Sequence, residues 1–114
     1  MEEKELENIV ATYFGLTPSR KLSKDVKIER VDVRDAEEIE EAKKLRIKWD
    51  NHIGSETKVG RITPLDILHY LKMSYTSQNY GKAVKILKYI AKRDELPLFK
   101  VEDEYLLINP KRRR

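Results

Sequence analysis

Four polar residues close to position 80 carry amide and ammonium groups at short spacing: Gln78, Asn79, Lys82 and Lys85. Each amide can both donate and accept a hydrogen bond at an adenine edge, and each ammonium can reach a guanine acceptor or a phosphate. Together with Lys88 and Lys92, the two lysines would line one face of a helix, and four cations there would give salt-dependent binding to a polyanion. The same spacing is also typical of a helix face that is only solvated, so both interpretations stay open.

Catalytic chemistry has few candidate groups in this chain. There is no cysteine, so a thiolate nucleophile and a cysteine zinc site are excluded. Asp50 and Asp66 lie near the two histidines, His52 and His69, but the histidines lack the i, i+4 spacing that helical metal sites use. The glycines are scattered rather than gathered in a phosphate-binding loop. We therefore expect no enzyme activity, no catalytic residue, no metal and no cofactor.

Two aromatic residues are candidates for stacking on single-stranded nucleic acid. Trp49 lies on an apolar stripe, so we expect it to be a core residue. Tyr75 lies in a stretch of turn-forming residues and is the better candidate for an exposed contact.

The composition indicates one cytoplasmic domain. A length of 114 residues is near the commonest domain size, and no window approaches the ~20 apolar residues of a membrane span. The abundance of Lys, Glu and Ile resembles that of hyperthermophile proteins. Charge is unevenly distributed, because residues 61–100 carry 8 basic against 3 acidic side chains, whereas residues 1–56 carry 11 against 14. Positive potential in the second half would attract a polyanion.

The N-terminal third predicts a helix and a strand. Apolar residues at helical spacing predict a helix over residues 2–14, which Gly15 ends. Residues 16–24 offer turn formers and basic side chains, which predict a loop. Apolar residues over 26–33 predict a strand that needs a bulge at Glu29-Arg30, where the alternation breaks.

The central part of the chain predicts a long helix. Asp35 suits an N-cap position, and acidic residues follow it in the first turn. An apolar period of 3.6 residues then predicts a helix from about 35 to 53, with Trp49 on its inner face. Gly54 would end this helix.

Start signals for a second helix follow a very short predicted strand at Arg61-Ile62. Thr63 as N-cap and Pro64 as the first helical residue predict a helix that ends near Met73. We expect Leu65, Leu68 and Leu71 to face inward from it.

A third helix and a hairpin are predicted for the C-terminal part. The helix begins at a cap formed by Thr76 or Ser77 and runs to about Arg93. Its inner stripe is expected to be Tyr80, Ala83, Val84, Leu87, Ile90 and Ala91. Residues 98–101 and 105–108 predict the two strands of the hairpin.

The element order over residues 35–109 is therefore helix, short strand, helix, helix and β-hairpin. This order, with Arg61-Ile62-Thr63-Pro64-Leu65-Asp66-Ile67-Leu68 at the entry to the second helix, resembles the winged-helix variant of the helix-turn-helix family. The resemblance implies an α+β fold with a winged-helix domain over 35–109. An N-terminal helix and strand extension over 1–34 would pack on this core, and 110–114 would be a basic tail.

In that family the second helix of the pair enters the DNA major groove through its N-terminal residues. The groove-facing residues implied here are Ser77, Gln78, Asn79, Lys82 and Lys85. The tail residues, which would neutralise phosphates, are Lys111, Arg112, Arg113 and Arg114. The hairpin tip, Glu102-Asp103-Glu104, departs from the family pattern because acidic side chains repel phosphate.

Three kinds of partner stay open at this point. The first hypothesis is a double-stranded DNA binder, a transcription or replication-associated factor of an archaeon or its virus. The second is a protein-docking adaptor or subunit of a larger nucleic-acid-processing complex, with the acidic hairpin as its contact. A third is RNA binding through residues 20–24 and the tail. Residues 1–34 would either cover the domain's own core or form a homodimer surface, and no membrane partner is expected.

Overall fold

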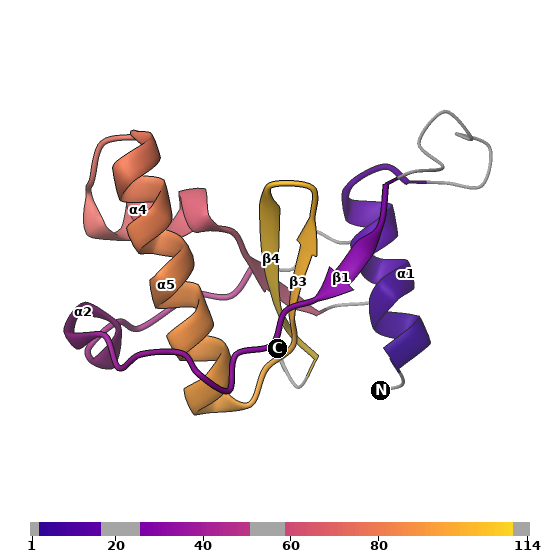
Figure 1. The fold of residues 1–114 in the computed structure, drawn as a ribbon, viewed down its shortest axis with the longest axis horizontal. Helices are drawn as coiled ribbons and strands as arrows, with labels where there is room; N and C mark the ends of the chain where they lie inside the picture. The colour runs from indigo at the N-terminus through magenta and orange to yellow at the C-terminus, as the bar shows by residue number, and fades with distance from the viewer. Residues whose placement is uncertain (1–2, 17–25, 51–58, 111–114) are drawn as a thin grey trace.

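The computed structural model describes residues 3–16, 26–50 and 59–110, and these residues form an α+β fold. In chain order the elements are α1 (Glu3–Tyr13), β1 (Ile28–Arg30), α2 (Glu40–Lys43), β2 (Gly60–Ile62), α4 (Pro64–Leu71), α5 (Ser77–Asp94), β3 (Leu98–Val101) and β4 (Glu104–Asn109). The β3–β4 hairpin lies in the middle of the molecule, with α4 and α5 on one side and α1 on the other (Figure 1).

All the strand pairs of the sheet are antiparallel, and the strand order is β1-β3-β4-β2. The predicted hairpin is therefore central, and the two short strands pair with its outer edges. Side chains alternate between the faces of the sheet. The Leu98–Leu107 pair belongs to the core beneath α4 and α5, and the neighbouring Phe99–Leu106 pair belongs to the core beneath α1.

Helix α1 covers the second face of the sheet. Its Leu6, Ile9 and Val10 are buried in one cluster with Phe99 and Ile108. Burying each such side chain contributes roughly 1.5–3 kcal/mol. Residues 1–34 could cover the domain's own core or form a homodimer surface. In the structure, helix α1 of the same chain covers this apolar face of the sheet.

Strand β1 is shorter and more regular than predicted. It spans residues 28–30 instead of 26–33, and all three residues pair with β3 in unbroken register. The predicted bulge at Glu29-Arg30 is wrong, because both residues have direct partners in β3. The backbone N–H of Val31 then donates to the Leu98 carbonyl at 2.8 Å, which carries the pairing one residue further.

The helix pair α4 and α5 begins at the predicted signals. Thr63 caps α4 in a reciprocal capping box with Asp66, and Pro64 is the first helical residue. Thr76 caps α5 by accepting a hydrogen bond from the N–H of Asn79 at 3.1 Å. Both helices end at a residue in the left-handed conformation, Lys72 for α4 and Glu95 for α5.

The inner stripe of α5 is almost the predicted one. Ala83, Val84, Leu87, Ile90 and Ala91 are buried, and Ile86 joins them. Tyr80, expected to face inward, is only partly buried.

The inward orientation predicted for Leu65 is wrong, since its side chain is 48% exposed. The buried side of α4 is formed instead by Pro64, Ile67 and Leu68. Leu65 lies about 100° round the helix from Pro64, which turns it away from this side.

The predicted helix over 35–53 is also wrong for the residues that the structure describes. Only α2, a single turn over Glu40–Lys43, is helical. From Leu45 to Trp49 partly buried apolar residues alternate with exposed basic ones, and a period of two is typical of extended chain. The N-cap residue of α2 is Ile39 instead of the predicted Asp35. Gly54, at which the predicted helix would end, lies outside the described residues.

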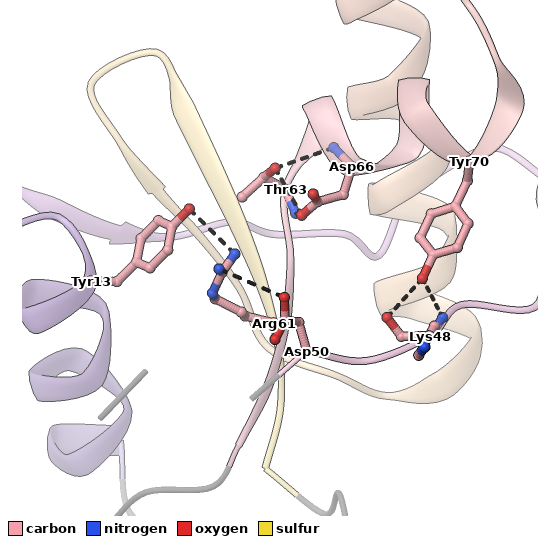
Figure 2. A network of polar contacts seen from close by, with 7 residues as sticks. All are labelled: Tyr13, Lys48, Asp50, Arg61, Thr63, Asp66 and Tyr70. Carbon is pink, nitrogen blue, oxygen red and sulfur yellow. Dashed lines mark hydrogen bonds and ion pairs between the residues drawn. The ribbon is translucent and has the colours of Figure 1, made fainter. Parts of the chain in front are cut away.

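Tertiary hydrogen bonds explain why this segment is extended (Figure 2). The Tyr70 hydroxyl accepts a hydrogen bond from the Lys48 N–H at 2.6 Å and donates one to the Lys48 carbonyl at 2.7 Å. The Asp50 carbonyl accepts from the Arg61 N–H at 2.8 Å. These backbone groups are therefore satisfied by α4 and β2 rather than by a helix of their own.

Candidate nucleic-acid interface

The solvent-facing side of α5 carries the predicted contact residues. Ser77, Gln78, Lys82 and Lys85 are all exposed. Because the opposite side of the same helix is anchored in the core, these four side chains are held on a rigid support. The polar and the apolar sides of α5 are thus divided as the periodicity predicts. The polar residues differ from one another, however, in the residues that lie beside them.

Asn79 is engaged within the protein. Its side-chain amide nitrogen donates to the Ser74 carbonyl at 2.9 Å and lies 3.2 Å from the Ser74 hydroxyl. These contacts fix the turn between α4 and α5. Asn79 is therefore better suited to positioning the start of α5 than to contacting a base edge.

Lys82 has an acidic neighbour on α2. Its ammonium forms an ion pair with the Glu41 carboxylate. The hydrogen bond from Lys82 holds the pKa of Glu41 below its usual value. Lys82 must exchange this partner to contact a phosphate, whereas no ion-pair partner for Lys85 occurs among the described residues.

The acidic hairpin tip lies beside the N-terminal part of α5. The Tyr80 hydroxyl donates to the Asp103 carbonyl at 3.0 Å, which ties the tip to the helix. Burial, and then the charges of Glu104 and Asp103, raise the pKa of Tyr80 above its usual value. The acidic tip, which departs from the winged-helix pattern, therefore lies beside the N-terminal end of α5. This is the end that the family resemblance places in the DNA groove.

A cationic pocket lies at the other end of α5. It has a volume of about 590 Å³ and is lined by Lys43, Lys44, Leu45, Arg46 and Arg93. The sequence does not predict this pocket, because the helical period places residues 43–46 in the middle of a long helix. The signal that could have found it is the basic run Lys43-Lys44-Leu45-Arg46.

A second pocket, of about 430 Å³, lies at the turn between α4 and α5. Its lining is Leu68, His69, Lys72, Met73, Ser74 and Tyr75. Tyr75 is 66% exposed, as predicted for a turn residue. This pocket is more apolar than the cationic one and suits an aromatic or aliphatic side chain.

The histidine and acidic residues do not gather into a metal site in the described part of the chain. Asp66 is engaged in the cap of α4, where its carboxylate accepts from the N–H and the hydroxyl of Thr63. His69 lies on the exposed side of the same helix. The remaining predicted candidates, His52, the loop at residues 20–24 and the tail Lys111–Arg114, lie outside the described residues.

Arg61 contacts residues of two other parts of the fold, Tyr13 and Asp50 (Figure 2). The Arg61 guanidinium lies 4.8 Å from the centre of the Tyr13 ring and 4.0 Å from the Asp50 carboxylate. The Arg61 side chain is only 15% exposed. These contacts join α1, β2 and the extended segment that ends at Asp50, so we assign them to the fold.

No family model, curated protein or solved structure shows a significant match to this chain. In the described ranges, the helices are too short or too polar to cross a bilayer.

Proposed function

We propose that this protein is a non-catalytic nucleic-acid-binding module that binds double-stranded DNA through the exposed side of α5. The observation that supports it is the division of this helix, whose buried stripe anchors it while Gln78, Lys82 and Lys85 project into solvent. Amide and ammonium groups are the ones that contact base edges and phosphates.

The winged-helix resemblance gives the proposed binding mode. From β2 onward the chain runs strand, helix, turn, helix and hairpin, and β2 pairs with β4. The helix expected before this unit is reduced to the single turn of α2. In the proposed mode α5 enters the major groove, Gln78 contacts a base edge, and Lys82 and Lys85 contact the backbone. A transcription or replication-associated role would suit such a module.

Binding in this mode requires the acidic hairpin tip to stay off the backbone. The tip is held next to Tyr80, which lies roughly 160° round the helix from Gln78 and Lys82, so the tip flanks the start of α5 and does not cover its exposed side. The repulsion favours an orientation in which the exposed side of α5 from Lys82 towards its C-terminal end lies closest to the phosphates. The tail residues Lys111–Arg114 would add non-specific phosphate contacts.

The test is the fluorescence anisotropy of a labelled duplex, measured at two salt concentrations. We expect salt-sensitive binding by the natural chain, weakened by tenfold or more in Lys82→Glu/Lys85→Glu. A matched control, Lys4→Glu/Lys27→Glu, makes the same charge change at exposed residues of α1 and the segment before β1. Equal losses in both double variants, or no binding by the natural chain, would contradict the proposal.

The second candidate is a protein-docking adaptor of a larger nucleic-acid-processing complex. The observations that favour it are the exposure of Tyr75, which lines the apolar pocket, the exposure of Leu65 on α4, and the acidic tip. Exposed aromatic residues beside a pocket are typical of interface anchors. Salt-insensitive binding to a protein partner that Tyr75→Ala abolishes, without any binding to DNA, would favour this candidate.

A further inference from the structure

The cationic pocket at the C-terminal end of α5 is a built feature rather than a chance group of surface lysines. Arg93 forms its wall, and this guanidinium donates to the Ala42 carbonyl at 2.9 Å and to both oxygens of Asp94 at 2.8 Å. It also lies 5.7 Å from the centre of the Tyr89 ring. Arg93 is therefore held in place before any ligand arrives, which lowers the entropic cost of binding.

Lys43 is held on the neighbouring side of the pocket. Its ammonium lies 3.0 Å from the Glu38 carboxylate and 3.3 Å from the Glu40 carboxylate. These hydrogen bonds raise the pKa of Lys43, and the one to Asp94 raises the pKa of Arg93. Both groups remain fully charged at neutral pH.

Lys44 and Arg46 carry positive charges that no neighbouring carboxylate in the described part of the chain neutralises, unlike those of Lys43 and Arg93. Both are exposed, and neither has an ion-pair partner among the described residues. The polar side chains that line the pocket are all cationic. Such a pocket attracts an anion that can accept several hydrogen bonds at once.

Phosphate is the anion that best suits this arrangement. The planar fork of Arg46, whose guanidinium has no ion-pair partner among the described residues, can donate two parallel hydrogen bonds to phosphate oxygens, and the lysines neutralise the remaining charge. The position of the pocket points to a nucleic-acid backbone as the source. Arg93 lies about 12 Å along the α5 axis from Lys85, a distance spanned by about three to four nucleotides of one strand at 3.4 Å each.

We propose that the pocket formed by Lys43, Lys44, Arg46 and Arg93 holds a backbone phosphate of the nucleic acid that α5 binds. This inference rests on the proposed function and adds a second contact to it. The pocket extends the interface from Lys85 to the C-terminal end of α5, away from the acidic tip. Lys44 and Arg46 are the residues that contribute binding energy, whereas Lys43 and Arg93 shape the site.

The salt dependence of duplex binding by Lys44→Gln/Arg46→Gln tests the pocket. Both substitutions are at exposed positions, so the fold should be retained, and circular dichroism checks this. Losing the one phosphate contact of the pocket should lower the magnitude of the slope of log K against log salt by about 0.9. At 0.1 M salt this corresponds to an affinity loss of about eightfold. Lys4→Gln/Lys27→Gln is the matched control and should leave the slope unchanged.

The outcomes separate the pocket from the proposed function. A slope unchanged in the pocket variant, with binding still lost in Lys82→Glu/Lys85→Glu, would overturn the pocket alone. No duplex binding by the natural chain would overturn both. Titration with inorganic pyrophosphate, followed by amide NMR shifts, identifies the source of the phosphate. Shifts at Arg46 and Arg93 with pyrophosphate, but no effect of the pocket variant on duplex affinity, would show a site for free phosphates and overturn the nucleic-acid assignment.

Discussion

The two ends of α5 differ in their electrostatic surroundings, although the helix carries polar residues along its whole exposed side. At the N-terminal end, Asn79 is engaged in the turn and the acidic hairpin tip is tied to Tyr80. At the C-terminal end, Arg93 and the 43–46 segment form a cationic pocket. Periodicity shows which residues are exposed, whereas the elements packed beside them decide which ligand they suit.

The largest loss of stability is expected from a substitution in the buried stripe of α5, which anchors both ends of the helix. Leu87 is fully buried in the middle of α5, so Leu87→Ala should destabilise the fold by roughly 2–5 kcal/mol. Urea unfolding followed by circular dichroism measures this loss. Lys85→Ala, on the exposed side two residues away, should change stability by no more than about 0.5 kcal/mol. A loss of less than 1 kcal/mol for Leu87→Ala would show that α5 is not anchored as described.

A smaller effect is expected from loosening only the C-terminal end. Arg93→Met removes the hydrogen bond to the Ala42 carbonyl and the pair with Asp94. Because Arg93 is partly exposed and screened, we expect a loss of about 1–2 kcal/mol. Thermal unfolding gives the value. Unchanged stability would indicate that α2 does not depend on Arg93 for its position.

The corresponding change at the N-terminal end is Tyr80→Phe, which removes one hydrogen bond to the hairpin tip. We expect a loss of about 0.5–1.5 kcal/mol at neutral pH. Since the pKa of Tyr80 is raised in the folded state above its ordinary value of 10.0, this contribution is complete below pH 10. It is lost as the pH rises through the raised pKa. Stability should therefore fall less steeply above pH 10 in Tyr80→Phe than in the natural chain, and parallel pH curves would refute this.

The smallest effect is expected where α2 touches the exposed side of α5. Glu41→Gln releases Lys82 from its ion pair and removes one negative charge. We expect duplex affinity to rise by a few fold at low salt, with the gain disappearing at high salt. Glu37→Gln, an exposed carboxylate on the same segment, is the control. An equal gain in the control would mean that only net charge matters.

Much of the fold could be predicted because its signals are local. Thr63-Pro64 and Thr76 begin α4 and α5 where the sequence places them, and the two hairpin strands form close to the predicted ranges 98–101 and 105–108. The predicted helix over 35–53 is wrong because side chains and strands distant in the sequence bind its backbone groups. Tyr70 takes both hydrogen-bonding groups of Lys48, and no pattern within 35–53 reveals this.

The candidate site could be predicted only in part for the same reason. The exposure of Gln78 and Lys85 follows from the helical period. The pairing of Lys82 with Glu41 and the binding of Asn79 to Ser74 depend on neighbours that the period does not specify. The cationic pocket required the 43–46 segment to leave the predicted helix.

The most direct test of binding through α5 is an amide NMR titration of the full chain with a duplex at low salt. We expect the largest shift changes along the exposed side of α5, from Gln78 to Lys85, and at Lys44 and Arg46. Smaller changes should occur at Glu102 and Asp103. Shifts confined to the hairpin tip and Tyr75, or no shifts at all, would contradict binding through α5.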